Sequence, residues 1–148
     1  MQTSVDLRLA RHGAIVLLLG LLIGFVITKF HNRGVGDVAH LVGLIGGFGM
    51  IALSTLWPKL NLGPTWSTIG AWAWAVCMYC NWLGVVLLGG FGSALLASPV
   101  LWDRTAHVLL QLAVWLSLLS TVIVLFGLRK SRTTATTESA VSAIVTAK

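Results

Sequence analysis

Four long runs of apolar residues, separated by short polar segments, dominate this chain. They cover residues 12–28, 38–57, 67–89 and 106–128. A helix needs about 20 mainly apolar residues, each rising ~1.5 Å, to cross the hydrocarbon core of a membrane. Short connections favour antiparallel neighbours. The pattern therefore predicts an all-α integral membrane protein, an up-down four-helix bundle formed by a single domain over residues 1–130. Residues 131–148 are rich in Thr, Ser and Ala and predict a flexible polar tail.

Composition and charge agree with a membrane protein. Of 148 residues, 57% are hydrophobic and only 9% are charged, whereas soluble domains carry roughly 25% charged residues. The positive residues lie mostly at the ends of the apolar runs, seven on the side of the termini and three (Lys29, Arg33 and Arg104) on the other. This asymmetry predicts that both termini are cytoplasmic, as in a bacterial inner-membrane protein in contact with anionic lipid. No basic stripe indicates binding to nucleic acid.

One histidine, His40, lies near the start of the second apolar run. An imidazole is costly in hydrocarbon, so it indicates a function. Gly43 and Gly47 follow at i+3 and i+7 on the same helical face. This face could receive another helix, or a flat macrocycle held by the imidazole nitrogen. Packing is the simpler alternative, because Gly20-x-x-x-Gly24 and Gly43-x-x-x-Gly47 both allow close contact between helices.

Other polar residues fall at membrane depth. Tyr79 and Asn81 lie in the third run, and His107 opens the fourth on the same side as His40. These four residues could meet in the outer half of the bundle, although Tyr79 and Asn81 point about 200° apart on a helix. The alternatives are an interhelical hydrogen bond for Asn81, a buried aromatic for Tyr79 and an interfacial position for His107. For His12 we expect headgroup contact or helix capping.

Two kinds of chemistry are disfavoured. Cys77 and Cys80 form a CxxC pair, but both lie in mid-helix among apolar neighbours, where a reactive low-pKa thiolate is not expected. The four acidic residues lie at span edges or in the terminal segments. A proton-coupled multidrug transporter would need a carboxylate inside the membrane, so the sequence argues against that class.

Several short motifs occur in an order that resembles a known family: Arg11-His12-Gly13, Ala39-His40-Leu41, Trp57-Pro58-Lys59-Leu60 and Tyr79-Cys80-Asn81-Trp82-Leu83. The set is similar to the hydroxylaminobenzene mutases and, more distantly, to the styrene oxide isomerases, over roughly residues 8 to 129. Mutases convert an arylhydroxylamine to an aminophenol, and styrene oxide isomerases turn an aryl epoxide into an aldehyde. The latter are homotrimers with ferric haem b between subunits, ligated by the histidine of the Ala-His motif.

The resemblance implies roles for two residues. His40 would be the axial ligand of the haem iron, and Asn81 would line the same cavity. The helical face that Gly43 and Gly47 share with His40 places them in the expected cofactor site. Depth and residue type predict that Asn81 or Tyr79 orients the substrate oxygen. The chain departs from the family pattern at positions where relatives carry polar groups. These positions hold Val42, Gly46, Cys77 and Val85. We therefore expect a changed epoxide or an N-oxygenated substrate, and styrene oxide itself is less favoured.

The sequence thus favours a membrane-embedded isomerase of an apolar aromatic substrate, with ferric haem b as a Lewis acid on the substrate oxygen. Its apolar interior would exclude water from a cationic centre, which Trp74, Trp82 or Tyr79 could stabilise. Two alternatives stay open. One is a membrane cytochrome b in which His40 and His107 both ligate haem. The other is a small non-enzymatic membrane subunit.

Overall fold

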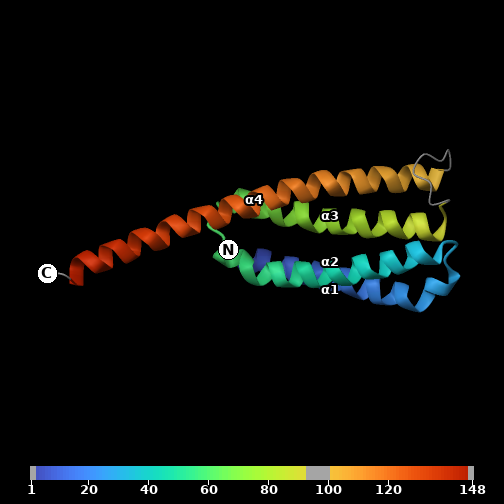
Figure 1. Cartoon of the computed structure of the whole chain (residues 1–148), viewed down its shortest axis with the longest axis horizontal. Helices are drawn as coiled ribbons and strands as arrows, with labels where there is room; N and C mark the ends of the chain where they lie inside the picture. The colour runs from blue at the N-terminus through green and yellow to red at the C-terminus, as the bar shows by residue number, and fades with distance from the viewer. Residues whose placement is uncertain (1–2, 93–100, 147–148) are drawn as a thin grey trace.

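The fold consists of four long helices and two short 3-10 turns, shown in Figure 1. It was obtained as a computed structural model, which describes residues 3–92 and 101–146. The helices are α1 (Thr3–Val26), α2 (Arg33–Leu56), α3 (Pro64–Gly90) and α4 (Leu101–Thr146), with turns η1 (Ile27–Lys29) and η2 (Trp57–Lys59) after the first two. All four are long and apolar enough to cross a membrane. The prediction of an all-helical, four-span membrane protein is therefore confirmed for the described residues.

Helix α1 begins before the apolar run from which the sequence predicts it. The apolar run begins at residue 12, whereas α1 begins at Thr3, with Asp6 in its first turn. An acidic residue there interacts favourably with the helix dipole. Leu9 lies in this added part and is almost fully buried. The early turns of α1 therefore belong to the packed bundle.

Helix α4 runs beyond the membrane-spanning part of the chain. It continues to Thr146, and Figure 1 shows this last part projecting away from the other helices. The segment after residue 130 was expected to be a flexible tail, but its backbone continues the helix. Alanine and the neighbouring polar residues are compatible with a helix that begins in a well-formed span. The mobility of this segment stays a prediction.

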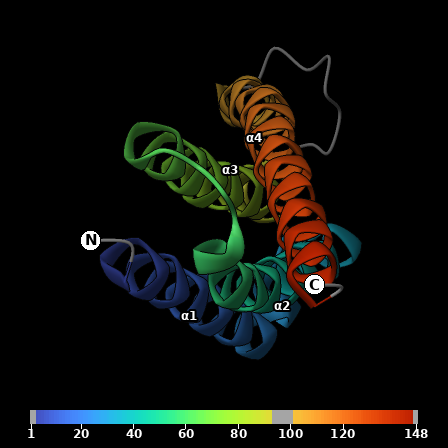
Figure 2. The same cartoon turned by 90° about the vertical axis from the view of Figure 1, so that its left-hand side faces the viewer.

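The helices form two hairpins. In Figures 1 and 2, α1 lies beside α2 and α3 beside α4, and each pair is antiparallel. Helix α3 contacts each of the other three, whereas α4 packs on α3 and has few contacts with α1 or α2. A groove of about 320 Å³ therefore remains between α2 and α4, with Trp74 of α3 on its wall. The expected up-down order is present, but the bundle is open along one side.

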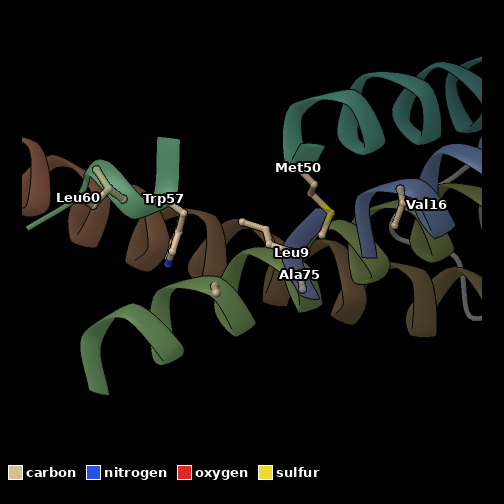
Figure 3. Close-up of a cluster of buried hydrophobic side chains, with 7 residues drawn as sticks. Leu9, Val16, Met50, Trp57, Leu60 and Ala75 are labelled. Atoms are coloured by element: carbon tan, nitrogen blue, oxygen red, sulfur yellow. The ribbon is translucent and has the colours of Figure 1, made fainter. Parts of the chain in front are cut away.

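The best-packed part of the core lies toward the end of the bundle that carries η2. Its buried side chains come from α1, α2, η2 and α3, as Figure 3 shows. Trp57 is completely buried, and its indole Nε1 donates to Ser67 Oγ over 2.9 Å. A buried indole N–H needs such a partner. The cluster comprises Leu9, Val16, Met50, Trp57, Leu60, Ala71 and Ala75.

Side-chain hydrogen bonds to backbone carbonyls fix α4 on α3. Ser120 Oγ donates to Gly70 O over 3.0 Å, and Cys77 Sγ donates to Ala113 O over 3.2 Å. Polar groups in lipid-embedded helices are satisfied in this way, because no water is available to them. Cys77 is buried in this contact. Its position supports a packing role.

Candidate functional site

His40 is held by the neighbouring helix. Its ring Nδ1 lies 2.8 Å from Gly20 O on α1. A carbonyl can only accept, so Nδ1 is the donor, and in the neutral imidazole the lone pair is then on Nε2. Nε2 has no hydrogen-bond partner among the described residues, and the side chain is only partly buried. The site therefore presents an oriented imidazole with Nε2 outside any hydrogen bond of the described chain.

Gly24 of α1 makes room for this imidazole. A Cβ atom built at Gly24 would lie 3.0 Å from His40 Cε1 and 3.1 Å from His40 Nδ1. Any larger residue there would compete with the ring for space. Gly20 supplies the acceptor and Gly24 supplies the space, so the Gly20-x-x-x-Gly24 motif shapes the histidine site from the opposite helix.

One interpretation of the sequence was that Gly43 and Gly47 form an open face beside His40. In the structure this face is not open. A Cβ at Gly43 would lie 2.4 Å from Gly20 Cα, and one at Gly47 would lie 2.6 Å from Leu17 N. The backbone of α1 therefore covers both glycines. The packing alternative is the one that the structure shows, because two glycine-rich helices gain most contact by bringing their backbones together. Their effect on His40 is indirect, through the position of Gly20.

Trp82 lies against the same helix crossing. Its Cδ1 would be 3.2 Å from a Cβ built at Gly43. Its indole Nε1 is buried and has no hydrogen-bond partner among the described residues. Such unpaired buried donors are rare, and the indole Nε1 of Trp74 is another one in the described part of the chain. Among the three aromatic residues considered from the sequence, Trp82 is the one packed beside the helix crossing that holds His40.

Tyr79 contacts His12, and this pairing was missed in the sequence. Tyr79 Oη lies 3.1 Å from His12 Nδ1, and the ring of His12 also packs against Trp72 with centroids 5.4 Å apart. The expectation of helix capping for His12 is wrong, because α1 begins at Thr3 and His12 lies well inside it. Its contact with headgroups stays a prediction. A usable signal was present: His12 shares a helical face with Leu9 and Val16, both of which are buried.

Asn81 lies on a different side of α3 from Tyr79. It follows Cys77 by four residues and Met78 by three, and these contact α4 and Gly46 of α2 respectively. Asn81 therefore lies on the face of α3 between α2 and α4, and it is partly exposed. Its side chain has no hydrogen-bond partner among the described residues. The expected angular separation of Tyr79 and Asn81 is confirmed.

No hydrogen bond joins these four polar residues to one another in the described part of the chain. His40 bonds to α1, and Tyr79 bonds to His12. His107 is exposed on α4, which packs on α3. The structure brings no second histidine into contact with His40 in its described part, so it gives no support to bis-histidine ligation within a single chain.

The bond between Tyr79 and His12 can be tested by removing one oxygen atom. The Tyr79→Phe variant keeps the ring and loses the hydroxyl, so we expect a loss of about 0.5–1.5 kcal/mol in the free energy of unfolding. Thermal unfolding in detergent would measure it. His12→Ala should cost a similar amount, and the double variant should cost less than the sum. Strictly additive effects would contradict a direct interaction.

Comparison with known proteins identifies the family to which the chain belongs. The family model described as styrene oxide isomerase matches residues 5–129. The chain belongs to the styrene oxide isomerase family. A hydroxylaminobenzene mutase of Ectopseudomonas oleovorans is 38% identical over 102 residues, which cover 66% of this chain and 62% of that protein. The chain thus matches less than two thirds of that relative's length. No solved structure matches significantly.

Membership of the styrene oxide isomerase family confirms the resemblance drawn from the sequence motifs. His40, Tyr79, Asn81 and the glycines of the α1–α2 crossing all lie inside the matched range. The names of the matching family and relative both describe isomerisations. The roles assigned to the individual residues stay predictions, and the structure adds where each one lies.

Proposed function

We propose that this protein is a membrane-embedded isomerase that rearranges an arylhydroxylamine to an aminophenol, with an aryl epoxide as the second substrate class. The similarity to a hydroxylaminobenzene mutase supports an arylhydroxylamine as the substrate. The family description, styrene oxide isomerase, supports an aryl epoxide. Both reactions are isomerisations in which substrate and product contain the same atoms, so no cosubstrate is consumed. The observation that carries the proposal is His40, a partly buried imidazole at membrane depth with Nδ1 anchored and Nε2 available.

The residues around His40 fit an axial ligand of haem b. Histidines that bind metals usually donate their other ring N–H to a backbone carbonyl or carboxylate, which fixes the tautomer and the ring orientation. Gly20 O has this role here, at 2.8 Å from Nδ1. When bound, ferric haem would supply a Lewis acid for the substrate oxygen. The chain itself supplies the oriented nitrogen, and Gly24 supplies the space that the ring needs.

A homotrimer, or another assembly of identical copies, would complete this site. His40 lines neither the groove between α2 and α4, nor the groove at the η2 end of the bundle, nor the small cavity beside His12. The second wall of a macrocycle pocket would therefore come from a neighbouring copy. Asn81 is partly exposed on the face of α3 between α2 and α4, where another copy can reach it. We propose that Asn81 orients the substrate oxygen from this face, and that Tyr79 supports the site through α1.

The apolar surroundings of His40 serve the same reaction. A cationic centre that forms when the N–O or C–O bond breaks would be trapped by water, so water must be kept away from it. Helices α1 and α2 cross at glycines with no gap between their backbones. An apolar aromatic substrate would reach the site from the surrounding lipid. The Trp82 ring, beside the crossing, could stabilise the cation by about 0.5–2 kcal/mol.

We infer that the protein lies in a bacterial inner membrane with both termini in the cytoplasm. The bond from Asn61 N to Gly127 O places the η2 turn beside the membrane-spanning end of α4. The bond from Asn32 N to Gly89 O joins the loops at the opposite end. Arg8, Arg11, Lys59 and Arg129 therefore share one end, and this excess of positive charge marks the cytoplasmic side.

The proposal is tested by an absorption spectrum of the detergent-purified protein, as isolated and after dithionite. We expect a Soret band with a high-spin ferric signature, since His40 would be the histidine ligand and no second histidine contacts it in the described part of the chain. Turnover of an arylhydroxylamine and of an aryl epoxide would then be followed by product analysis. Purification from haem-replete cells with no Soret band would overturn the haem site, and a six-coordinate low-spin spectrum would favour the electron carrier.

Asn81 provides a separate test of the catalytic assignment. Its side chain has no hydrogen bond to lose in the chain, so Asn81→Ala should leave the unfolding temperature and the haem spectrum nearly unchanged. If Asn81 orients the reacting oxygen, turnover should fall by roughly 10²-fold, the typical cost of removing one such donor. Steady-state kinetics would measure it. Unchanged kcat in a correctly loaded variant would contradict the role.

A further inference from the structure

An apolar groove lies at the end of the bundle opposite to the His40 site. Its volume is about 670 Å³. It runs between α4 and the segment that joins η2 to the first turn of α3. Apolar side chains form most of its wall, and the two polar ones are Asn61 and Arg129. The lining comprises Asn61, Leu62, Gly63, Trp66, Leu119, Val122, Ile123, Phe126 and Arg129.

The length of the groove matches one leaflet of a membrane. Its wall on α4 runs from Leu119 to Arg129, a distance of about 15 Å at ~1.5 Å per residue. Half of the ~30 Å hydrocarbon core has the same thickness. Leu119, Val122 and Phe126 are 42%, 48% and 65% exposed, so the described part of the chain leaves them uncovered. An extended acyl chain has the length and the chemistry to cover them.

The charged end of the groove lies at the membrane surface. Arg129 ends the membrane-spanning part of α4, and the positive residue Lys59 ends η2 at the same end of the bundle. Trp66 lies beside them in the first turn of α3 and is exposed, as interfacial tryptophans are. An arginine at this level attracts the negative headgroups of the cytoplasmic leaflet. The groove thus has an apolar body and a cationic head region.

We propose that this groove binds one acyl chain of an anionic phospholipid, with the headgroup phosphate at Arg129. The charge at one end and the apolar length below it select an amphiphile over a free anion or a neutral hydrocarbon. The site is separate from the proposed reaction, because His40 lies near the start of α2 and the groove lies beyond its end. The outcome of a lipid-binding experiment therefore does not depend on whether the protein binds haem.

The full-length protein in detergent would be incubated with equal amounts of phosphatidylglycerol and phosphatidylcholine, and the bound lipid read by native mass spectrometry. We expect phosphatidylglycerol to be retained preferentially. Val122→Trp fills the groove and should abolish retention. Arg129→Gln removes the charge and should lower the preference for phosphatidylglycerol about fivefold, the effect of one basic residue near a membrane surface.

Two matched variants control for general effects. Val114→Trp enlarges an exposed valine on the same helix outside the groove, and Arg104→Gln removes an exposed arginine at the other end of the span. Both should retain lipid as the unchanged protein does. Equal retention of the two lipids, retention of no lipid, or full retention by Val122→Trp would each overturn the proposal. So would a change of oligomeric state in Val122→Trp, because the groove would then be a protein interface.

Discussion

Replacing His40 with alanine is expected to remove bound haem and isomerase turnover together. Nε2 of His40 is the proposed iron ligand, and no second histidine contacts it in the described structure. Removing a group that hydrogen-bonds to a metal ligand typically costs 10- to 100-fold in metal affinity. Removing the ligand itself should therefore lower haem affinity by at least about 100-fold. The Soret absorbance per protein and the product formed would be measured on the same preparation.

Controls separate ligation from folding. His107→Ala should keep both the absorption and the turnover, since His107 is exposed on α4. The His40 bond to Gly20 O also joins two helices, so helix content and gel-filtration behaviour must be compared with those of the unchanged protein. In a His40→Gly variant, added imidazole should occupy the vacated space and restore part of the haem absorption. Full turnover by His40→Ala would rule out the iron mechanism.

The second large effect is expected at the crossing of α1 and α2. A Cβ added at Gly43 would lie 2.4 Å from Gly20 Cα and 2.9 Å from Gly20 N. These are backbone atoms and cannot rotate aside, so Gly43→Ala must push the two helices apart. Overpacking of this kind costs about 1–3 kcal/mol. Thermal unfolding in detergent would show it as a lower midpoint.

Gly49 is the matched control on the same helix. A Cβ added there meets nothing within 4 Å. Gly49→Ala should be neutral or stabilising by up to about 1 kcal/mol, because alanine favours the helix. A Gly43→Ala variant as stable as Gly49→Ala would contradict the close crossing. Since Gly20 O also orients His40, Gly43→Ala should weaken haem retention as well, whereas Gly49→Ala should not.

Much of the architecture could be predicted from local sequence. Four apolar runs with short connections imply four antiparallel spans, because a span must satisfy its backbone hydrogen bonds internally. The small residues at positions 20, 24, 43 and 47 implied close helix contact, and the structure pairs Gly20 with Gly43. Family motifs identified the styrene oxide isomerase family, and a family model then matched residues 5–129. These features depend on residue type and spacing along one helix.

The side-chain partners could not be predicted in the same way. His12 and Tyr79 are 67 residues apart, and their bond depends on how α1 lies against α3. The Gly43–Gly47 face was ambiguous between a helix and a macrocycle, because both need a flat surface. Only the position of α1 decides between them. The shared cavity expected for Asn81 and His40 stays a prediction, because depth alone does not specify which helix face each residue occupies.

The sequence by itself thus determined the number, order and antiparallel arrangement of the spans, the family, and the position of a histidine within an apolar span. Helical periodicity and the cost of polar groups in lipid act within one segment, so one segment is enough to reveal them. The tertiary structure decided that Gly20 and Gly24 hold and accommodate His40, that Tyr79 pairs with His12, and that the bundle is open between α2 and α4. These depend on the relative rotation of whole helices, which many side-chain contacts set together.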